Sequence, residues 1–528
     1  MVSDYLQTVD WSRAQFALTA VYHWLFVPLT LGLSVLVAIM ESCWVRTGDE
    51  FWRRTARFWM RLFGVNFAIG VATGLILEFE FGTNWSNYSY FVGDIFGAPL
   101  AIEGIMAFFL ETTFIAVMFF GWDKVSRGVH LTATWLTAVG ASLSAWWILV
   151  ANAWMQYPVG CTFNLGSVRN EMTSFWEVAF SPVAVNKFFH TVASSFMLAA
   201  LFVVGVSAWY LLRRREERMA RQSIGVASVF GFVFALVTAF TGDRSGALVA
   251  RVQPMTLAAL EALYNGQAGA PLTVVGVLRP AGSRTADDPF YFGLGVPKLL
   301  SVMSFRDAQA YVPGIGDLLA GNPKQGILSA AEKMARGRVA VAELARYRAA
   351  SEAGDRRTMA AVGRKFDPAT SEGEEFLSEY FAYLGYGYLE TPAQLVPNVP
   401  LLFYWFRVMV GAGLLFIVVL GVVWWLNRRN RLASRRWLLR TCVWMIPLAY
   451  LASQAGWVVT EAGRQPWAIQ DLMPVGVAAS KIPGASVSVT FFLFLALFTA
   501  LFVAEVSILL RQIKIGPDAA GNSEPQKL

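Results

Sequence analysis

The chain contains few charged residues, few histidines and few cysteines, and each shortage excludes a class of protein. Charged residues make up 15% of its 528 residues and hydrophobic residues 56%, which excludes an ordinary soluble domain and indicates a polytopic membrane protein. The three cysteines, Cys43, Cys161 and Cys442, lie far apart in sequence, so we expect neither a disulfide framework nor a cysteine metal site. The net charge of +7 does not indicate a nucleic-acid partner, because the basic residues flank apolar segments.

Nine apolar segments are long enough to cross a bilayer of about 30 Å. We therefore expect an all-α polytopic membrane protein with spans near residues 16–40, 62–81, 99–121, 130–150, 187–212, 223–241, 399–426, 437–459 and 487–511. The first apolar run is too long for a cleavable signal peptide and lacks a basic segment before it.

Arginine and lysine concentrate in alternate connections between these spans. They are Arg46, Arg53, Arg54 and Arg57 in the first connection, Lys124 and Arg127 in the third, Arg213, Arg214, Arg215, Arg218 and Arg221 in the fifth, and Arg428, Arg429, Arg431, Arg435 and Arg436 in the seventh. By the positive-inside rule, we expect the N-terminus outside and the C-terminus inside.

This topology divides the chain into four parts. We expect spans one to six in residues 1–241, one large external loop in 242–398, spans seven to nine in 399–511, and a cytoplasmic polar tail in 512–528. The loop is far longer than an ordinary connection and contains helical stretches such as 326–354, so we expect it to be functional or disordered.

Two of the three histidines, His23 and His190, lie inside apolar spans. An imidazole in lipid is costly and usually functional. A neutral imidazole can bind a metal, which in the core of a helix bundle is often a haem iron. A hydrogen bond to a neighbouring helix explains either histidine equally well. The third, His130, lies at the cytoplasmic edge of the fourth span.

The third span contains two carboxyl groups, Glu103 and Glu111, eight residues apart. At 3.6 residues per turn they share roughly one helix face and lie about 12 Å apart along the axis. Two carboxyls on one face of a membrane helix indicate a proton relay. The alternative is a pair of structural carboxyls that are satisfied by hydrogen bonds.

Two later spans also contain unusual side chains. Met409 alone is typical of core packing, but Arg407 within the same span needs a carboxylate partner, for which haem propionates are suitable. Trp457, Glu461 and Arg464 could line a cofactor pocket or form an interfacial ion pair within an aromatic belt. With the predicted topology, one group of candidate ligands lies in the outer half of the membrane, which indicates a haem layer near the outer face. The group is His23, His190, Glu103, Glu461 and, less closely, Met409.

Six stretches together match one family pattern. They are FALTAVYHWLFVPLTLG, FGVNFAIGVATGLILEFEFGTNW, VGDIFGAPLAIEGIMAFFLE, WILVANAWMQYPVG, KFFHTVASSF and GRQPWAI. Along nearly its whole length the chain resembles subunit I of the cytochrome bd-type quinol oxidases, including the cyanide-insensitive branch. The resemblance implies a three-haem subunit of a non-pumping but electrogenic respiratory oxidase. Such an enzyme oxidises membrane quinol on the outer face and reduces dioxygen to water with protons taken from the cytoplasm.

The resemblance also implies ligand roles for the intramembrane residues. His190 and Met409 match the axial ligands of a low-spin haem b. His23 and Glu461 match the ligands of two high-spin haems, one a haem b and the other haem d or a further haem b, and which residue serves which haem stays open. Positions beside the haems or their propionates are matched by Trp457, Arg13, Arg407 and Arg464.

Proton and quinol roles follow from the same resemblance. Glu103 and Glu111 match the carboxylates of the family's proton path, with Ser144 nearby. Within the loop segment VQPMTLAALE, Glu261 corresponds to the quinol-oxidising glutamate, and Gln253 and Thr256 are further candidates for quinol binding.

Two positions depart from the family pattern. Thr256 stands where the family commonly has lysine, so a hydroxyl replaces a charge. Gln454 stands where some relatives carry a glutamate. The first change puts the affinity for quinol and the head-group preference in question.

The resemblance further implies a second large membrane subunit, often a very small third subunit, and the bacterial cytoplasmic (inner) membrane. Two other classes remain open. An ion or proton transporter would usually show inverted repeats, which the sequence lacks. A haem-bearing electron-transfer subunit without oxygen chemistry would pair histidines on facing helices, and it would leave Met409 and Glu461 unexplained.

Overall fold

The computed structural model describes residues 2–280, 283–285 and 287–517. In this part of the chain nine helical segments are long and apolar enough to cross a membrane, and they coincide with the nine predicted spans. The predicted all-α membrane fold is therefore confirmed. The spanning helices are α1 (Val2–Thr47), α2 (Glu50–Thr83), the continuous segment α3 (Ser86–Ile102), η1 (Glu103–Phe108) and α4 (Phe109–Phe120), α5 (Arg127–Gln156), α7 (Pro182–Leu212), α8 (Glu217–Val252), α15 (Val399–Arg428), α16 (Arg436–Gly463) and α18 (Gly484–Ile515).

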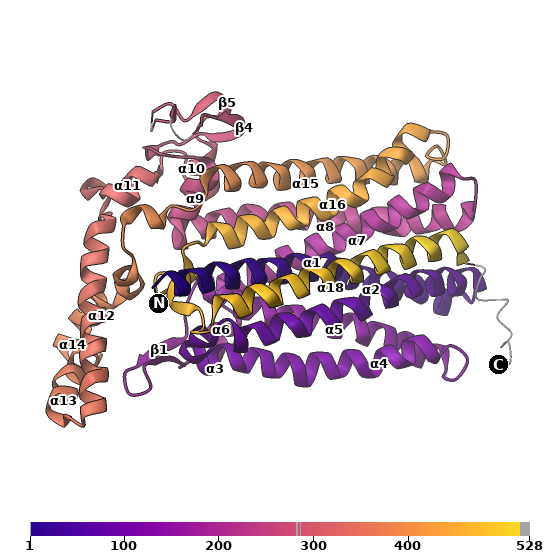
Figure 1. The fold of residues 1–528 in the computed structure, drawn as a ribbon. Helices are drawn as coiled ribbons and strands as arrows, with labels where there is room; N and C mark the ends of the chain where they lie inside the picture. Colours follow the sequence, from indigo (N-terminus) through magenta and orange to yellow (C-terminus); the bar gives the residue numbers. More distant parts are fainter. Residues whose placement is uncertain (1, 281–282, 286, 518–528) are drawn as a thin grey trace.

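The bundle has two chemically different ends (Figure 1). At one end, which we call the loop end, α1 begins and the described residues between α8 and α15 project. At the other, which we call the basic end, lie the connections 121–126, 213–216 and 429–435, which include several of the predicted arginines. Of the predicted tail 512–528, α18 includes the first residues up to Ile515, and 518–528 lie outside the described residues.

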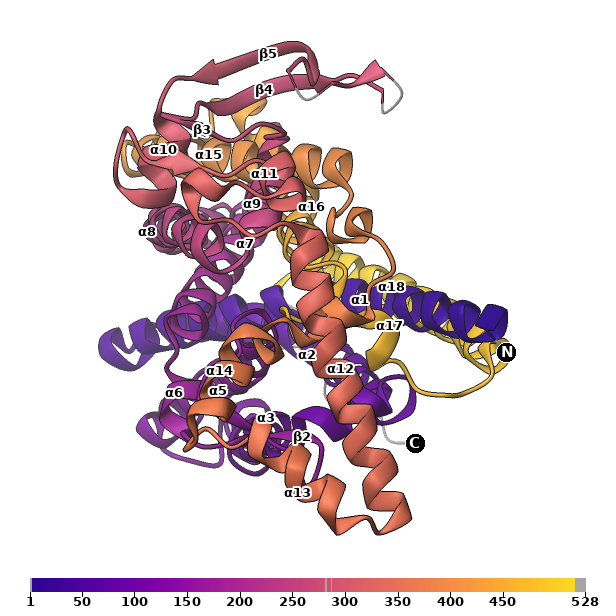
Figure 2. The ribbon, with the colours of Figure 1, turned by 90° about the vertical axis from the view of Figure 1, so that its left-hand side faces the viewer.

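The projecting loop is folded rather than structureless. Helix α8 continues past the predicted boundary at 241 to Val252, because the polar turns after the apolar run keep their helical hydrogen bonds. The Asp243 side chain in these turns also accepts a hydrogen bond from the Arg306 side chain at 3.1 Å. The helices of the loop are α9 (Pro254–Glu261), α10 (Leu299–Phe305), α11 (Ile315–Ala320), η3 (Pro323–Gln325), α12 (Ala330–Ala353), α13 (Arg356–Lys365), α14 (Ser371–Glu379), η4 (Phe381–Tyr388) and η5 (Pro392–Leu395). Figure 2, which looks onto the loop end, shows α12 crossing over the bundle.

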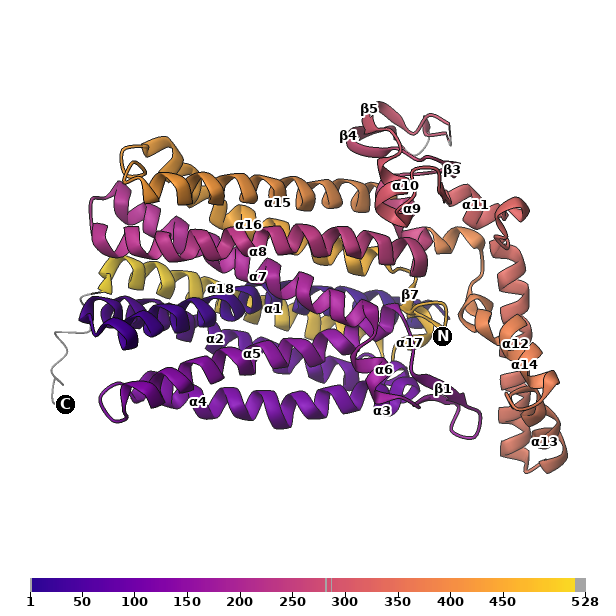
Figure 3. The same cartoon turned by 180° about the vertical axis from the view of Figure 1, so that it is seen from behind.

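Short antiparallel strand pairs and two short helices complete the fold. The pairs are β1 (Cys161–Asn164) with β2 (Arg169–Met172), β3 (Gln267–Ala268) with β6 (Tyr311–Val312), β4 (Leu272–Leu278) with β5 (Phe290–Val296), and β7 (Trp467–Ile469) with β8 (Met473–Pro474). The helices are α6 (Phe175–Ala179) and α17 (Val475–Ala478). All four strand pairs lie at the loop end (Figures 1 and 3).

Helix α7 is the centre of the bundle, and 83% of its most apolar window is buried. Small residues let its neighbours approach closely, as is common between membrane helices. A Cβ added at Gly32 of α1 would lie 2.4 Å from Ala199, and one added at Gly231 of α8 would lie 2.6 Å from Ala200. The helix that carries His190 is therefore held on several sides.

Four helices enclose a common interior. Helix α7 packs on α8 and α16, and α15 packs on the same two helices. Helices α7 and α15 therefore lie diagonally opposite each other across the group. Side chains that project inward from facing helices are where a helix bundle builds cofactor sites.

Candidate functional site

His190 and Met409 lie on the two diagonal helices, α7 and α15. Each is next to a glycine of an intervening helix. A Cβ added at Gly242 of α8 would lie 3.3 Å from the His190 ring, and one at Gly456 of α16 would lie 3.2 Å from the Met409 sulfur. The glycines thus keep space beside both side chains.

The hydrogen bonds of His190 define its tautomer. The Thr241 hydroxyl donates to the Val237 carbonyl oxygen at 2.8 Å, so its oxygen accepts from the His190 Nδ1–H at 3.1 Å. A proton on Nδ1 leaves the lone pair on Nε2, which is the form that binds iron. The threonine therefore prepares this histidine as a ligand.

His23 has the same arrangement on the other side of the bundle. The Thr73 hydroxyl of α2 donates to the Gly70 carbonyl oxygen at 3.0 Å and accepts from His23 Nδ1–H at 3.0 Å. A glycine again lies beside the imidazole, since a Cβ added at Gly74 would lie 3.0 Å from the His23 ring. Two histidines on different helices thus share one pattern, a threonine on Nδ1 and a facing glycine.

Glu461 lies at the loop end of α16 and connects this helix to α5. Its Oε1 accepts a hydrogen bond from Asn152 of α5 at 3.1 Å, and its Oε2 pairs with Arg464. One turn earlier, Trp457 packs edge-on against Trp24 of α1 with ring centroids 5.0 Å apart. The predicted neighbours Trp457, Glu461 and Arg464 are therefore brought together.

Several buried donors around Glu461 have no hydrogen-bond partner in the described part of the chain. They are Lys187 Nζ, Tyr88 Oη, and Arg464 Nε and Nη1. Lys187 lies one turn before His190, and its ammonium is 5.6 Å from the Trp457 ring centroid. Buried unpaired donors are rare, and two of these residues carry charge, so the pocket is suited to an anionic group.

Glu103 and Glu111, the two carboxyl residues of the third span, lie more nearly on a single face of their helix than they would in a regular α-helix. Eight residues span about 2.2 turns of an α-helix. Residues Glu103–Phe108 form a π-helix, whose wider turns bring eight residues nearer to two full turns. Glu103 accepts a hydrogen bond from Ser144 of α5 at 2.7 Å, and Glu111 is buried against α5 at Gly140.

Glu261 and Arg407 form a buried ion pair at the loop end, 2.8 Å apart. Arg407 also donates to the backbone oxygens of Leu260 at 2.6 Å and Thr273 at 2.7 Å. Its expected carboxylate partner is thus a protein side chain. Burial raises the pKa of Glu261 to about 7, although the guanidinium opposes that shift.

The other two quinol-binding candidates are also buried. The Thr256 hydroxyl donates to the Gly463 carbonyl oxygen of α16 at 2.8 Å, so it connects α9 to the bundle. Gln253 caps α8 and begins α9, and its Nε2 has no partner within the described residues. The hydroxyl at 256 is therefore engaged, and the amide at 253 is available to a ligand.

Two further candidates lie beside this region. Arg13 is half-exposed and donates to Gln465 of the GRQPW segment at 3.2 Å. Gln454 donates to the Val21 carbonyl oxygen of α1 at 2.8 Å. Both therefore connect α1 to α16 or to the segment after it.

Sequence reasoning missed several functional candidates. Lys187 is a cation at the start of the predicted fifth span, and Asn152 is an amide two residues after the predicted fourth span, so both were visible in the sequence. The roles of Thr73 and Thr241 had no sequence signal, because threonines are common in membrane helices and only the contact with a histidine distinguishes these two.

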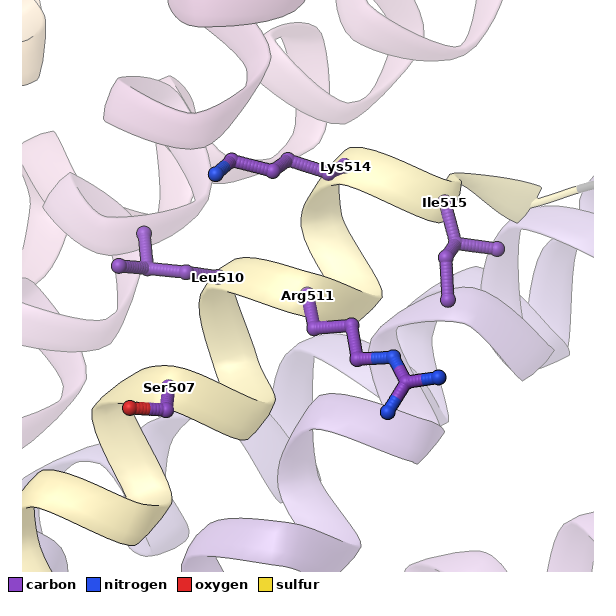
Figure 4. Close-up of a pocket in the computed structure, with 5 residues that line it drawn as sticks. All are labelled: Ser507, Leu510, Arg511, Lys514 and Ile515. Atoms are coloured by element: carbon purple, nitrogen blue, oxygen red, sulfur yellow. The ribbon is translucent and has the colours of Figure 1, made fainter.

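The described part of the chain contains no group of three or more His, Cys, Asp or Glu residues that could hold a bare metal ion. A surface hollow at the basic end of α18 is lined by Ser507, Leu510, Arg511, Lys514 and Ile515 (Figure 4). All five residues come from one helix, and the hollow is at the opposite end from Glu261 and Glu461.

The geometry agrees with comparisons across the whole chain. The family model for cytochrome bd terminal oxidase subunit I matches residues 11–517. The chain belongs to this family. It is 42% identical over 522 residues to cytochrome bd-II ubiquinol oxidase subunit 1 of Escherichia coli (strain K12), with 98% of each chain covered. It is 32% identical over 509 residues to cytochrome bd ubiquinol oxidase subunit 1 of Bacillus subtilis (strain 168), with 96% of this chain and 94% of that protein covered.

A solved structure agrees as well. The bd oxidase from Geobacillus thermodenitrificans superposes with a TM-score of 0.76 at 25% identity, covering 97% of this chain and 99% of that one. As a bd oxidase subunit I, the chain is part of an oxidoreductase. The family implies haem cofactors and a second subunit in the same membrane complex.

The residues present in this bd oxidase subunit fit haem. Two histidines are prepared with Nε2 free to bind iron, and glycines beside His23, His190 and Met409 keep space that a Cβ would fill. The unpaired donors of Lys187 and Arg464 suit carboxylates such as propionates.

Proposed function

We propose that this chain is the haem-bearing subunit of a quinol oxidase in the bacterial cytoplasmic membrane. It oxidises membrane quinol at the loop end and reduces dioxygen to water with protons from the basic end. The observation that carries the proposal is the buried Glu261–Arg407 pair, which lies at the loop end and only two residues from Met409. Relatives named as ubiquinol oxidases support the choice of substrate class.

Glu261 accepts the proton of a quinol hydroxyl in this proposal. A base works best when its pKa lies near the operating pH, and a pKa of about 7 meets that condition. Arg407 stays charged and holds the carboxylate in position. Each quinol releases two electrons and two protons, so two quinols supply the four electrons that reduce one dioxygen to two waters.

The candidate ligands form two kinds of haem site in this proposal, one for electron transfer and one for dioxygen reduction. His190 and Met409 would together hold a haem b, which would supply electron transfer. His23 and Glu461 would each hold one of the other two haems, a haem b and either haem d or a further haem b, which would supply the reduction of dioxygen. Thr241 and Thr73 keep the imidazoles of His190 and His23 oriented, and Trp457 packs against Trp24, the residue after His23.

Helix α5 offers a route for protons from the basic end. There His130 Nε2 donates to the Met118 carbonyl oxygen at 3.1 Å, and Nδ1 lies 2.6 Å from Glu41. That second bond needs a proton on either the imidazole or the carboxyl, so the pair can hold one. Further along α5 lie the contacts with Glu111, Glu103 and Glu461.

The basic end faces the cytoplasm in this proposal, as the positive-inside rule predicts. Quinol protons then leave outside and water protons enter from inside, which separates charge without a pump. A second large subunit would cover the exposed apolar surface of the third span, where Ile105 and Phe109 are 68% and 64% exposed. A very small third subunit remains a prediction from the resemblance.

Haem content tests the proposal first. We expect a pyridine haemochrome assay on the purified complex to find three haems per subunit I. A far-red chlorin band in reduced-minus-oxidised spectra would identify haem d, and its absence would indicate three b-type haems. A complex without haem would overturn the proposed oxidase function. The intramembrane carboxyls would then favour an ion transporter. One or two haems would favour the electron-transfer subunit without oxygen chemistry.

Oriented vesicles test the direction of proton uptake. We expect oxygen consumption to alkalinise the compartment that faces the basic end and to acidify the compartment that faces the loop end. Uptake of the water protons from the loop end would contradict the proposed route along α5.

A further inference from the structure

The hairpin of β4 and β5 has one entirely apolar, solvent-exposed face. Register pairs Val275 with Leu294 and Val277 with Phe292, and paired residues lie on the same side of a sheet. These four side chains are 54%, 59%, 49% and 59% exposed, respectively. Neither strand contains a charged residue.

The opposite face of the hairpin is fixed to α15. Gly276 is buried there, and a Cβ at this position would lie 3.2 Å from the Phe403 ring. Phe290 and Phe403 pack with ring centroids 5.4 Å apart, and the Leu278 N–H donates to the Tyr404 hydroxyl at 3.0 Å. The apolar face therefore points away from the bundle.

The hairpin continues the exposed apolar surface of a spanning helix. In all three views it lies at the periphery, beyond the loop end of α15 (Figures 1, 2 and 3). Further along α15, Val408, Leu414 and Val418 are 38%, 58% and 61% exposed. Lipid surrounds the exposed apolar side of such a span, and the hairpin lies where that side reaches the edge of the bilayer.

We propose that this face is a membrane-contacting element that inserts into the acyl chains of the leaflet at the loop end. An exposed contiguous apolar face of this kind marks an interaction surface, and here it adjoins the lipid-facing side of the bundle. The strand edges still need hydrogen bonds, so the insertion is shallow and stays at the interface. Arg279 follows β4, pairs with Asp288 at 2.7 Å and covers Tyr291, as expected of a charge at headgroup level.

The inserted strand also forms a wall of the Glu261 site. The Thr273 carbonyl oxygen of β4 accepts a hydrogen bond from Arg407 Nη2 at 2.7 Å, and the same nitrogen holds Glu261. Lipid contact on one side of β4 therefore steadies the ion pair on the other. This consequence rests on the proposed quinol function, whereas membrane contact itself does not.

Spin labels measure the contact directly. The label is placed at Phe292→Cys in the complete oxidase, in a chain with Cys43→Ser and Cys161→Ser that retains the buried Cys442. Two matched positions serve as controls, Val418→Cys for lipid and Val339→Cys of α12, which is 43% exposed at the loop end, for water. The complex is reconstituted in phosphatidylglycerol–phosphatidylcholine nanodiscs, and collision rates with oxygen and with a water-soluble nickel chelate are recorded.

We expect the oxygen-to-nickel ratio at Phe292 to exceed that at Val339 several-fold and to approach that at Val418. A ratio within about twofold of Val339 would show a water-exposed face and overturn the proposal. Low collision rates with both reagents would show that protein covers the face, which would overturn lipid as the occupant in favour of the second subunit or a second copy. If Phe292→Cys fails to assemble, Leu294→Cys gives the same measurement on the same face.

Discussion

Arg407 lies 2.8 Å from Glu261 although 146 residues separate them, and it lies only two residues before Met409. One side chain therefore joins the loop that carries the candidate base to the helix that carries a candidate iron ligand. This relationship connects proton and electron chemistry at one point of the fold.

Replacing the candidate base should stop turnover without removing cofactor. We expect Glu261→Gln to reduce quinol oxidase activity by at least about 100-fold, the usual contribution of a positioned base. The haem spectrum should be unchanged. Glu390→Gln, an exposed carboxyl in the same loop, is the matched control and should retain full activity. Comparable activity in both variants would remove Glu261 from the mechanism.

The pH dependence of kcat/KM should follow Glu261. Only the ionised carboxylate can accept a proton, and its pKa of about 7 predicts that kcat/KM falls as the pH drops below about 7. Arg407 lowers this pKa, so Arg407→Gln should move the acidic limb of the profile to higher pH. The control Arg428→Gln at the basic end should leave it in place. An unshifted limb in Arg407→Gln would argue against Glu261 as the titrating group.

A pair of methionine variants tests the low-spin ligand. Met409→Leu keeps the size of the side chain but removes the thioether, so we expect loss of the low-spin haem signal or a lower reduction potential. Met445→Leu changes a buried methionine of the neighbouring spanning helix α16 and should leave the spectrum intact. Redox titration of both variants decides the assignment, and equal potentials would exclude Met409.

A pair of glycine variants on α8 tests the space beside His190. Gly242→Ala places a Cβ 3.3 Å from the His190 ring, whereas a Cβ at Gly246 meets nothing within 4 Å. Alanine favours a helix over glycine by about 1 kcal/mol, so neither change should unfold α8. We expect reduced haem content or a shifted absorbance in Gly242→Ala alone. Identical spectra would mean that no macrocycle occupies this side of the histidine.

The loop should loosen when its contact with Asp471, four residues after the GRQPW segment, is removed. The Tyr386 hydroxyl donates to Asp471 at 2.8 Å, and Gly385 N–H donates to the Asp471 carbonyl oxygen at 3.0 Å. Burial raises the pKa of the Asp471 carboxyl, and the hydrogen bond from the Tyr386 hydroxyl opposes that rise. We expect Tyr386→Phe to destabilise loop docking by about 1–2 kcal/mol.

Limited proteolysis of α12 in the assembled complex measures that effect. Faster cleavage is expected in Tyr386→Phe than in Tyr388→Phe, which changes a half-exposed tyrosine two residues away. Equal cleavage rates would show that the Tyr386–Asp471 contact does not secure the loop.

The sequence by itself determined the nine spans, because hydropathy over some twenty residues depends on composition and needs no partner. It also identified His23, His190, Glu103 and Glu461 as costly residues in lipid, and the cost is a local property of each side chain. The helical stretch at 326–354 was likewise readable, and it appears as α12.

Only the tertiary structure decided which of these residues meet. Arg407 pairs with the carboxylate of Glu261, a contact that sequence reasoning did not predict, and Thr256 turns its hydroxyl to α16. The π-helix at Glu103 and the outward apolar face of β4 and β5 were equally invisible in the sequence. Hydrophobicity determines which segments enter the membrane, but contacts between residues far apart in the chain depend on how the helices pack, and packing is a property of the whole bundle.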